Sequence, residues 1–291
     1  MLKEILAFVN NKGGVGKTTS VQSVAAAILR NDKKSKILCI DLDPQCNLSS
    51  LMGWTSIKKN YPDHDNHSII NALSSGEEGI LSIYQHSDRL FFIPSSQGLE
   101  GIEIVLSSKM TPKQMLGRVL FNTVLLNERG KEGEKILPEP KPINIEEYFD
   151  YVIIDCAPSL GTLTINALDA ADSVVIPVEP EGFSIGGLGR ILNAIKEVNT
   201  YLRGKGTPKL DIRGIFFVKV ETRTNIARGV MQSLKETYDE FILDSYVRKC
   251  NRIKDAQIQA MDIFAYDSQC AAAKDYDAVT KEILSRIKKK G

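Results

Sequence analysis

Apolar and polar positions occur in blocks along the chain, and the block lengths predict strands that are followed by helices. Residues 5–10 (ILAFVN) and 36–41 (KILCID) are short apolar runs. Between them, residues 18–30 (TTSVQSVAAAILR) are rich in alanine and place apolar side chains at helical spacing. A strand, a glycine-rich turn, a helix and a second strand in this order predict a parallel β-α-β unit.

The same pattern recurs through the rest of the chain. Further apolar runs predict buried strands at residues 90–95, 151–159, 173–180 and 212–220. These runs are nearly continuous, which is typical of parallel strands covered by helices on both faces. Helical spacing predicts helices at residues 99–107, 111–126, 161–170, 184–201, 224–240 and 270–289. We therefore expect a doubly wound α/β fold, with a mostly parallel central sheet flanked by helices.

Two polar segments interrupt this pattern, and we interpret both as surface insertions. Residues 54–67 (WTSIKKNYPDHDNH) and 127–144 (NERGKEGEKILPEPKPIN) combine charge with turn-forming residues and show no period. Strands of one type lie on both sides of each segment, so neither has to separate domains. Residues 1–291 are expected to form a single domain, which is long enough to bury a core without disulfides or metals.

Composition and charge narrow the possible functions. Hydrophobic residues make up 43% of the chain and charged residues 25%, which argues against collagen, coiled coil and long disorder. A net charge of +1 argues against a globally basic nucleic-acid binder, although it allows a local patch. The five cysteines include no CxxC pair, which favours reduced thiols. Because no apolar run approaches the roughly 18 residues that span a membrane, and no signal peptide is evident, we expect a cytoplasmic location.

The strongest chemical signal is the glycine-rich segment 11–19 (NKGGVGKTT), between the first predicted strand and helix. This is the context that a phosphate-binding P-loop requires. Glycines allow consecutive N–H groups to turn inward as an anion nest, and the helix N-terminus adds partial positive charge. Lys17 is expected to reach the β- and γ-phosphates of a nucleotide, and the Thr18 hydroxyl to ligate Mg²⁺. The predicted nucleotide-binding residues are Lys12, Gly13, Gly14, Val15, Gly16, Lys17, Thr18 and Thr19.

Two departures from the general P-loop pattern are informative. Asn11 stands where the pattern has its first glycine, and Lys12 adds a second lysine close to the phosphates. The arrangement KGGVGKT resembles the deviant Walker A motif of the ParA/MinD family of ATPases. The resemblance implies that Lys12 crosses the interface of a homodimer to the nucleotide of the other subunit. ATP would then be sandwiched between the two subunits.

Acidic residues follow two of the predicted strands. Asp41 and Asp43 end the second strand in DLDPQCN, and Asp155 ends the strand YVIID. Carboxylates at the carboxyl ends of parallel strands lie beside the ligand site of a doubly wound sheet. Four apolar residues followed by aspartate form a Walker B pattern, so Asp155 is expected to hold Mg²⁺ opposite Thr18.

Both acidic segments are also similar to segments of the ParA/MinD family. The resemblance of DLDPQ-x-N to the ParA branch implies that Asp43 orients the attacking water, that Asn47 lies near the metal and phosphate, and that Asp41 supports the loop. It also makes the D-x-x-P that runs from Asp155 to Pro158 a second switch segment. The predicted switch residues are Asp41, Asp43, Asn47, Asp155 and Pro158.

Phosphoryl transfer needs charge neutralisation and positioning more than covalent chemistry. The predicted catalytic residues are accordingly Lys12, Lys17 and Asp43. Carboxylates are weak bases at neutral pH, so Asp43 is expected to position water more than to deprotonate it. The family resemblance further implies slow hydrolysis that a partner stimulates.

Positive charge is concentrated between Arg203 and Lys254. Twelve basic and six acidic residues give this segment a net charge of +6, which leaves −5 for the rest of the chain. By composition alone, these are solvated helix faces. Residues 221–230 (ETRTNIARGV), however, resemble the SRTNLA segment of ParA ATPases, and residues 247–257 (VRKCNRIKDAQ) resemble their PRNVRLSEAP segment.

In the ParA ATPases, arginines near these two segments form a non-specific DNA surface. The resemblance therefore implies DNA-binding candidates, with Lys249 and Lys254 as helpers. These candidates are Arg223, Arg228, Arg248 and Arg252. Such contacts to phosphates would ignore sequence and would weaken steeply with salt.

These motifs and the family resemblance predict a ParA-type ATPase that uses ATP and Mg²⁺. It would dimerise on ATP, bind DNA non-specifically, associate with the nucleoid, and drive plasmid or chromosome partition with a ParB-type centromere-binding partner. The sequence leaves open the cargo and the residues that contact the adenine base.

Three alternative functions stay open. In a MinD-like ATPase, the basic tail at residues 279–291 (VTKEILSRIKKKG) would lie on a membrane, although it lacks Trp and Phe. A P-loop ligase of the dethiobiotin type would act on a small molecule. An adaptor would bind ATP without turnover, but the presence of both Lys17 and Asp43 argues against it.

Overall fold

A single mixed sheet forms the centre of the computed structural model. The model describes residues 1–60, 67–76, 80–122, 124–127, 139–181, 184–204 and 206–288. Within these ranges the sheet has nine strands in the order β6-β5-β3-β4-β2-β7-β1-β8-β9. The strands are β1 (Glu4–Phe8), β2 (Ile37–Leu42), β3 (Leu81–Ser87), β4 (Leu90–Ile93), β5 (Val124–Asn127), β6 (Lys141–Ile143), β7 (Tyr151–Cys156), β8 (Ser173–Val178) and β9 (Asp211–Phe217).

The central strands are all parallel, which confirms the predicted mostly parallel, doubly wound sheet. Strand β1 lies between β7 and β8, and β2 lies between β4 and β7, with every pairing parallel. Antiparallel pairing occurs only at β3–β4 and β5–β6 among the described strands. All six strands predicted from apolar runs are present, as β1, β2, β4, β7, β8 and β9.

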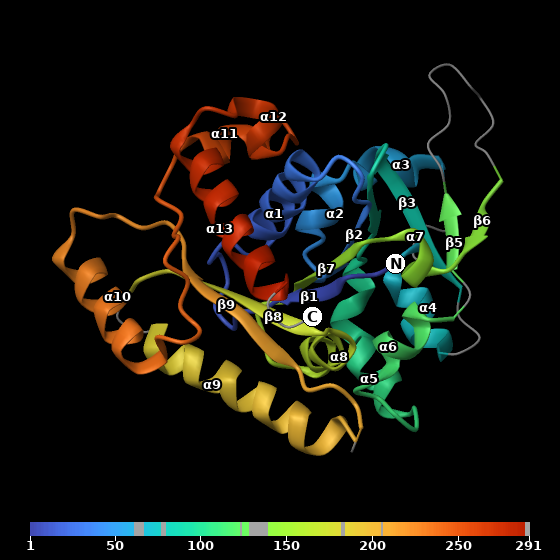
Figure 1. The fold of residues 1–291 in the computed structure, drawn as a ribbon. Helices are drawn as coiled ribbons and strands as arrows, with labels where there is room; N and C mark the ends of the chain where they lie inside the picture. The colour runs from blue at the N-terminus through green and yellow to red at the C-terminus, as the bar shows by residue number, and fades with distance from the viewer. Residues whose placement is uncertain are drawn as a thin grey trace.

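Helices cover both faces of the sheet (Figure 1). On one face lie α1 (Lys17–Asn31), α2 (Asn47–Leu51), α11 (Arg252–Ile258), α12 (Ile263–Asp267) and α13 (Ala271–Lys288). On the other face lie α4 (Ile69–Ser75), α5 (Ile102–Ser107), α6 (Met115–Leu120), α8 (Thr162–Ala170) and α9 (Ser184–Glu197). The remaining helices are α3 (Trp54–Ile57), η1 (Lys58–Asn60), η4 (Gln97–Gly101), α7 (Ile145–Tyr148), η5 (Val198–Leu202) and α10 (Asn225–Tyr238).

The alternation of side chains along β1 shows why residues 5–8 of this strand are all apolar. Ile5 and Ala7 belong to the core under one layer of helices, and Leu6 and Phe8 belong to the core under the other. Successive side chains of a strand point to opposite faces. A strand with helices on both faces is therefore apolar at most positions.

The predicted helix over residues 111–126 is wrong at its carboxyl end. Helix α6 covers only Met115–Leu120, and Val124–Asn127 form β5, which pairs in parallel with β3. Val124 and Leu126 are buried together in the core. A short apolar run satisfies helical and strand patterns equally well, and here pairing with the distant strand β3 decides its structure.

The two predicted surface insertions contain regular structure at their ends. In residues 127–144, Asn127 ends β5, and Lys141–Ile143 form the edge strand β6, which tolerates Pro142 because an edge strand needs fewer N–H donors. In residues 54–67, α3 begins at Trp54, whose ring packs against the Tyr84 ring with 4.8 Å between the two ring centroids. Residues 61–66 and 128–138 lie outside the described residues.

The carboxyl-terminal helix packs into the core. Along α13, Ile283 is fully buried, and Leu284 and Ile287 pack against the same cluster. The apolar residues that could make this segment a membrane-binding tail therefore pack against the protein core instead. No helix in the described part of the chain is long and apolar enough to cross a bilayer. The interpretation of residues 1–291 as a single domain stays a prediction.

Candidate nucleotide-binding site

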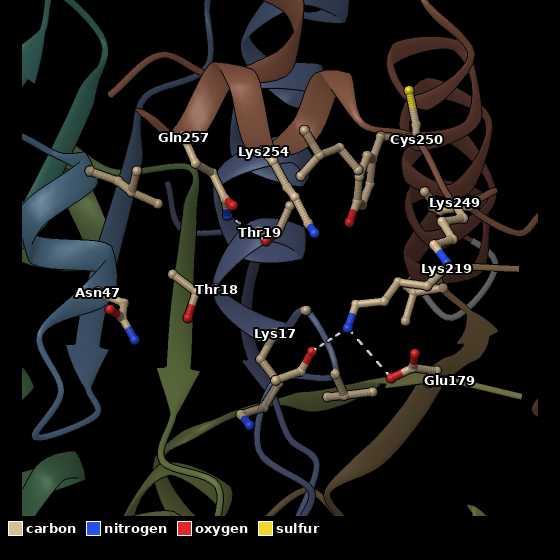
Figure 2. A pocket seen from close by; sticks show the side chains of 18 of the residues that line it. Lys17, Thr18, Thr19, Asn47, Glu179, Lys219, Lys249, Cys250, Lys254 and Gln257 are labelled. Carbon is tan, nitrogen blue, oxygen red and sulfur yellow. Dashed lines mark hydrogen bonds and ion pairs between the residues drawn. The ribbon is translucent and has the colours of Figure 1, made fainter. Parts of the chain in front are cut away.

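A cavity of about 790 Å³ lies at the carboxyl ends of the central strands. Ligands of open α/β sheets bind at this edge. One wall of the cavity comes from the loop between β1 and α1, and the opposite wall comes from the segment that leads into α11. The lining includes Gly14–Thr19, Asp43, Asn47, Pro158, Glu179, Lys219, Val247–Asn251, Ile253, Lys254 and Gln257. Figure 2 shows side chains from both walls converging on the cavity.

The loop from Asn11 to Gly16 has the backbone of a phosphate-binding loop. Gly14 and Gly16 have φ angles of 72° and 92°, in the left-handed region that glycine adopts without strain. Gly16 directly precedes α1 and has no side chain that could cap its first N–H groups. Because Gly14–Thr19 line the cavity, an anion bound there would lie at the positive end of the helix dipole.

Lys17 is held in a largely buried position at the start of α1. Only 6% of the residue is exposed, and its Nζ lies 3.4 Å from the carbonyl oxygen of Lys12. Burial lowers the pKa of Lys17, and the negative charge of Asp155 opposes that shift. An anionic ligand in the cavity would stabilise the charged ammonium further.

Asp41 supports the loop that follows β2. Its carboxylate accepts hydrogen bonds from the backbone N–H of Ser49 at 2.8 Å, from the Ser49 hydroxyl at 2.6 Å and from the backbone N–H of Asp43 at 3.0 Å. Burial raises the pKa of Asp41 to about 6 in spite of these bonds. The bonds fix the positions of Asp43 and Asn47, which both line the cavity.

Asp155 lies next to Asp41 in the sheet, but its surroundings are different. It is fully buried, and neither carboxylate oxygen has a hydrogen-bond partner among the described residues. Burial, together with the charge of Asp41, raises the pKa of Asp155 well above its usual value. A buried carboxylate without partners is costly unless a cation binds to it.

The residues present fit a magnesium ion that arrives with a nucleotide. In the described part of the chain, no three His, Cys, Asp or Glu side chains are grouped to hold a metal by themselves. Mg²⁺ commonly takes only one or two protein ligands and completes its shell with phosphates and water. Asp155 and the Thr18 hydroxyl are oxygen groups of this kind. When bound, the ion would neutralise charge on the phosphates.

Lys12 does not line the cavity of its own chain, and its ammonium pairs with two glutamates after β8. Its Nζ lies 2.5 Å from Glu181 Oε2 and 3.6 Å from Glu179 Oε2. The hydrogen bond to Glu181 raises the pKa of Lys12. The structure therefore brings Gly14–Thr19 together at the cavity, but it does not bring Lys12 there.

Sequence reasoning missed several residues of the site. Lys219 Nζ donates a hydrogen bond to the carbonyl oxygen of Gly14 at 2.6 Å, and Gln257 Nε2 donates one to Thr19 Oγ1 at 2.9 Å. Glu179 is the first residue after β8, and Lys219 is the second residue after β9. Their position at the carboxyl ends of parallel strands was the available signal. Gln257 lies on a helix far along the chain and had no such signal.

The four arginines predicted to bind DNA lie in different surroundings. Arg223 and Arg228 are exposed at the start of α10, where Arg228 donates a hydrogen bond to Asn225 at 2.7 Å. The Arg248 guanidinium donates two hydrogen bonds to Asp275, at 2.8 and 2.7 Å, and Arg248 lines the nucleotide cavity.

Arg252 lies on α11, in another part of the molecule from α10 (Figure 1). It is exposed, and its nearest acids are Asp255 at 3.8 Å and Asp267 at 3.7 Å. The arginines therefore divide between α10 and the α11 region, and those near α11 have acidic neighbours.

A glycine loop with a buried lysine, acidic strand ends and a doubly wound sheet together define the class of P-loop nucleoside triphosphatases. A family model described as an AAA domain matches residues 3–212. The chromosome-partitioning ATPase Soj of Treponema pallidum is 32% identical over 283 residues, which cover 97% of this chain and 97% of that protein. The sporulation initiation inhibitor protein Soj of Bacillus subtilis is 30% identical over 284 residues, which cover 97% and 98%. The chain belongs to the ParA/MinD family and is a ParA-like ATPase.

Solved structures share this fold, and some of them hold a nucleotide. Apo McdA of Cyanothece superposes with a TM-score of 0.75 at 21% identity, over 97% of this chain and 99% of that one. Cobyrinic acid a,c-diamide synthase of Mycobacterium smegmatis, solved with ADP and magnesium, superposes with a TM-score of 0.72 at 25% identity, over 100% and 97%. ATP and Mg²⁺ are the expected cofactors, and these comparisons confirm that expectation.

Proposed function

We propose that this ATPase is a partition ATPase whose association with a second copy and with DNA depends on the bound nucleotide. The observation that carries the proposal is the position of Lys12. Its side chain is 44% exposed, does not line the cavity that holds Lys17, and pairs with the exposed Glu181 and with Glu179 at the cavity wall. A lysine in this position is available to a second subunit, as the deviant Walker A motif requires.

Within one subunit, each group at the cavity has a distinct role. The loop N–H groups and Lys17 bind the β- and γ-phosphates. Thr18 and Asp155 are the protein ligands of Mg²⁺. Asp43 holds the attacking water, and Asp41 fixes the loop that carries Asp43.

The proposed DNA surface centres on the start of α10 and extends to α11. Arg223 and Arg228 are exposed there, and the segment from Arg203 to Lys254 carries a net charge of +6. Arg252 on α11 contributes if the dimer brings the two helices to the same duplex. Arg248 contributes less, because its guanidinium is already paired with Asp275.

A ParB-type protein bound to the cargo would stimulate hydrolysis and release the dimer from DNA. The names of the Soj relatives support a role in partition, and one of them is called a chromosome-partitioning ATPase. Nucleoid association would follow from non-specific DNA binding.

A DNA titration with two nucleotides tests the proposal. The protein is titrated against a duplex of arbitrary sequence, once with Mg-ADP and once with a non-hydrolysable Mg-ATP analogue. We expect tight binding only with the analogue, together with a dimer in analytical ultracentrifugation. Equal and weak DNA binding with both nucleotides, with a monomer throughout, would contradict the proposal.

One structural similarity favours a second candidate, an ATP-dependent ligase for a small molecule. The synthase from Mycobacterium smegmatis shares the fold over the whole chain. A ligase would consume ATP in the presence of its acid substrate, and its ATPase activity would not respond to DNA or to a centromere-binding protein. The DNA titration therefore separates the two candidates.

A further inference from the structure

Lys219 occupies an unusual position two residues after the end of β9. Its backbone has a φ angle of 53°, in the left-handed region that residues with side chains seldom adopt. Such conformations persist where the surrounding structure holds them, and they are common at functional sites. The side chain lies in the nucleotide cavity, and Figure 2 shows its ammonium between the phosphate loop and Glu179.

The ammonium of Lys219 touches the phosphate loop directly. Its Nζ lies 2.6 Å from the carbonyl oxygen of Gly14 and 3.4 Å from Glu179 Oε2. An ammonium has three N–H donors, so one donor is left for a ligand after these two contacts. The side chain is 44% exposed, which allows it to turn toward the cavity.

Glu179 connects this lysine to Lys12. The same oxygen, Oε2, lies 3.4 Å from Lys219 Nζ and 3.6 Å from Lys12 Nζ. One carboxylate oxygen therefore lies near two ammonium groups. Phosphate oxygens that enter the cavity would compete with Glu179 for Lys219, because charge-assisted hydrogen bonds to phosphate are strong.

We propose that Lys219 is a third lysine of the nucleotide site, which binds the polyphosphate chain, and that Glu179 is the counter-ion that it shares with Lys12 before the nucleotide binds. Neither residue belongs to the glycine loop or to the acidic segments. The inference rests only on ATP binding, so it does not depend on DNA, on a partner or on dimerisation.

A purely structural role for Lys219 makes a different prediction. If its bond to Gly14 only held the loop, removing the ammonium would lower the stability of the free protein, and the charge of Glu179 would not matter to the ligand. If Lys219 binds phosphate, the ligand affinity depends on the ammonium, and removing the charge of Glu179 strengthens binding.

Calorimetric titrations with ADP and with inorganic tripolyphosphate, both with Mg²⁺, distinguish the two roles. The variants are Lys219→Met, Lys219→Arg, Glu179→Gln and the double variant Lys219→Met/Glu179→Gln. Lys281→Met is the matched control, because Lys281 pairs with Asp277 on α13 and lies outside the cavity. Thermal melts of each free variant report its stability.

We expect Lys219→Met to weaken both ligands by roughly tenfold or more, the size of a lost hydrogen bond to a charged group. Lys219→Arg should retain most of the affinity. Glu179→Gln should tighten both ligands, and this gain should shrink in the double variant because the two residues are coupled.

Two results would overturn the proposal. One is parental affinity for both ligands in Lys219→Met, whatever its melting temperature. The other is a Glu179→Gln variant that binds both ligands no more tightly than the parent. The second result decides the question even if Lys219→Met does not fold.

Discussion

Asp41 and Asp155 face each other on the neighbouring parallel strands β2 and β7, yet only Asp41 has hydrogen-bond partners among the described residues. Both side chains are at most 1% exposed. Because its carboxylate is satisfied by hydrogen bonds within the protein, Asp41 holds the loop after β2 in place. Asp155 has no comparable set of hydrogen bonds and lies near the Thr18 hydroxyl, which suits a carboxylate that receives a metal ion.

The raised pKa of Asp155 predicts how the stability of the nucleotide-free protein depends on pH. The pKa of Asp155 is raised in the folded state, so the folded protein binds the proton more tightly than the unfolded chain does. The free energy of unfolding therefore falls as pH rises above the ordinary aspartate pKa of about 4. Asp155→Asn removes this titration, so its stability relative to the parent should increase between pH 5 and pH 8.

Urea unfolding at the two pH values, without nucleotide or Mg²⁺, measures that difference. Asp88→Asn, at an exposed turn between β3 and β4, is the control for a general loss of charge. A difference between Asp155→Asn and the parent that is the same at both pH values would show that Asp155 does not titrate in this range.

Replacing Lys12 should separate nucleotide binding from dimerisation. Lys12→Ala removes an ammonium that lies outside the cavity of its own chain, so ADP affinity should change by no more than about threefold. The ATP-dependent dimer should be lost in sedimentation velocity. Lys17→Ala is the comparison, and it should lose nucleotide binding itself. Normal dimers of Lys12→Ala would refute the crossed-lysine role.

Replacing Asp43 should slow hydrolysis without preventing ATP binding. Asp43→Ala removes the carboxylate that lines the cavity beside Asn47, and a fall in turnover of about a hundredfold or more is expected from losing the group that positions water. Phosphate release measures turnover, and sedimentation shows whether an ATP dimer persists. Turnover equal to that of the parent would remove Asp43 from the mechanism.

The arginines at α10 should matter more for DNA than the paired arginine at the cavity. Arg223→Glu should weaken binding to a random duplex by about tenfold or more and should lower the salt dependence of binding. Its ATPase activity without DNA should match that of the parent. Fluorescence anisotropy at several salt concentrations measures both effects.

Arg248→Glu serves as the comparison for Arg223→Glu. It breaks the pair with Asp275 at the rim of the cavity, so it should alter nucleotide binding as well as DNA binding. A DNA affinity of Arg223→Glu equal to that of the parent would place the DNA surface elsewhere.

Much of the sheet could be predicted because its strands are buried on both faces. A strand such as β7 is apolar at every position up to Asp155, and this pattern is visible without knowledge of its neighbours. Strand β5 was mistaken for part of a helix, because four residues are too few to show a period and only pairing with β3 makes them a strand. Strand β6 was not predicted because it contains Pro142, a residue that disfavours strands but is tolerated at the edge of a sheet.

The sequence by itself determined the phosphate loop and the acidic strand ends, because each is a contiguous segment whose chemistry depends on local backbone geometry. Only the tertiary structure brought Lys219 to Gly14, Gln257 to Thr19 and Asp275 to Arg248. Those pairs are separated by tens to hundreds of residues, and side-chain contacts of this kind depend on which strands and helices pack together. The order of the strands in the sheet, which no local pattern contains, therefore decides which charges the nucleotide meets.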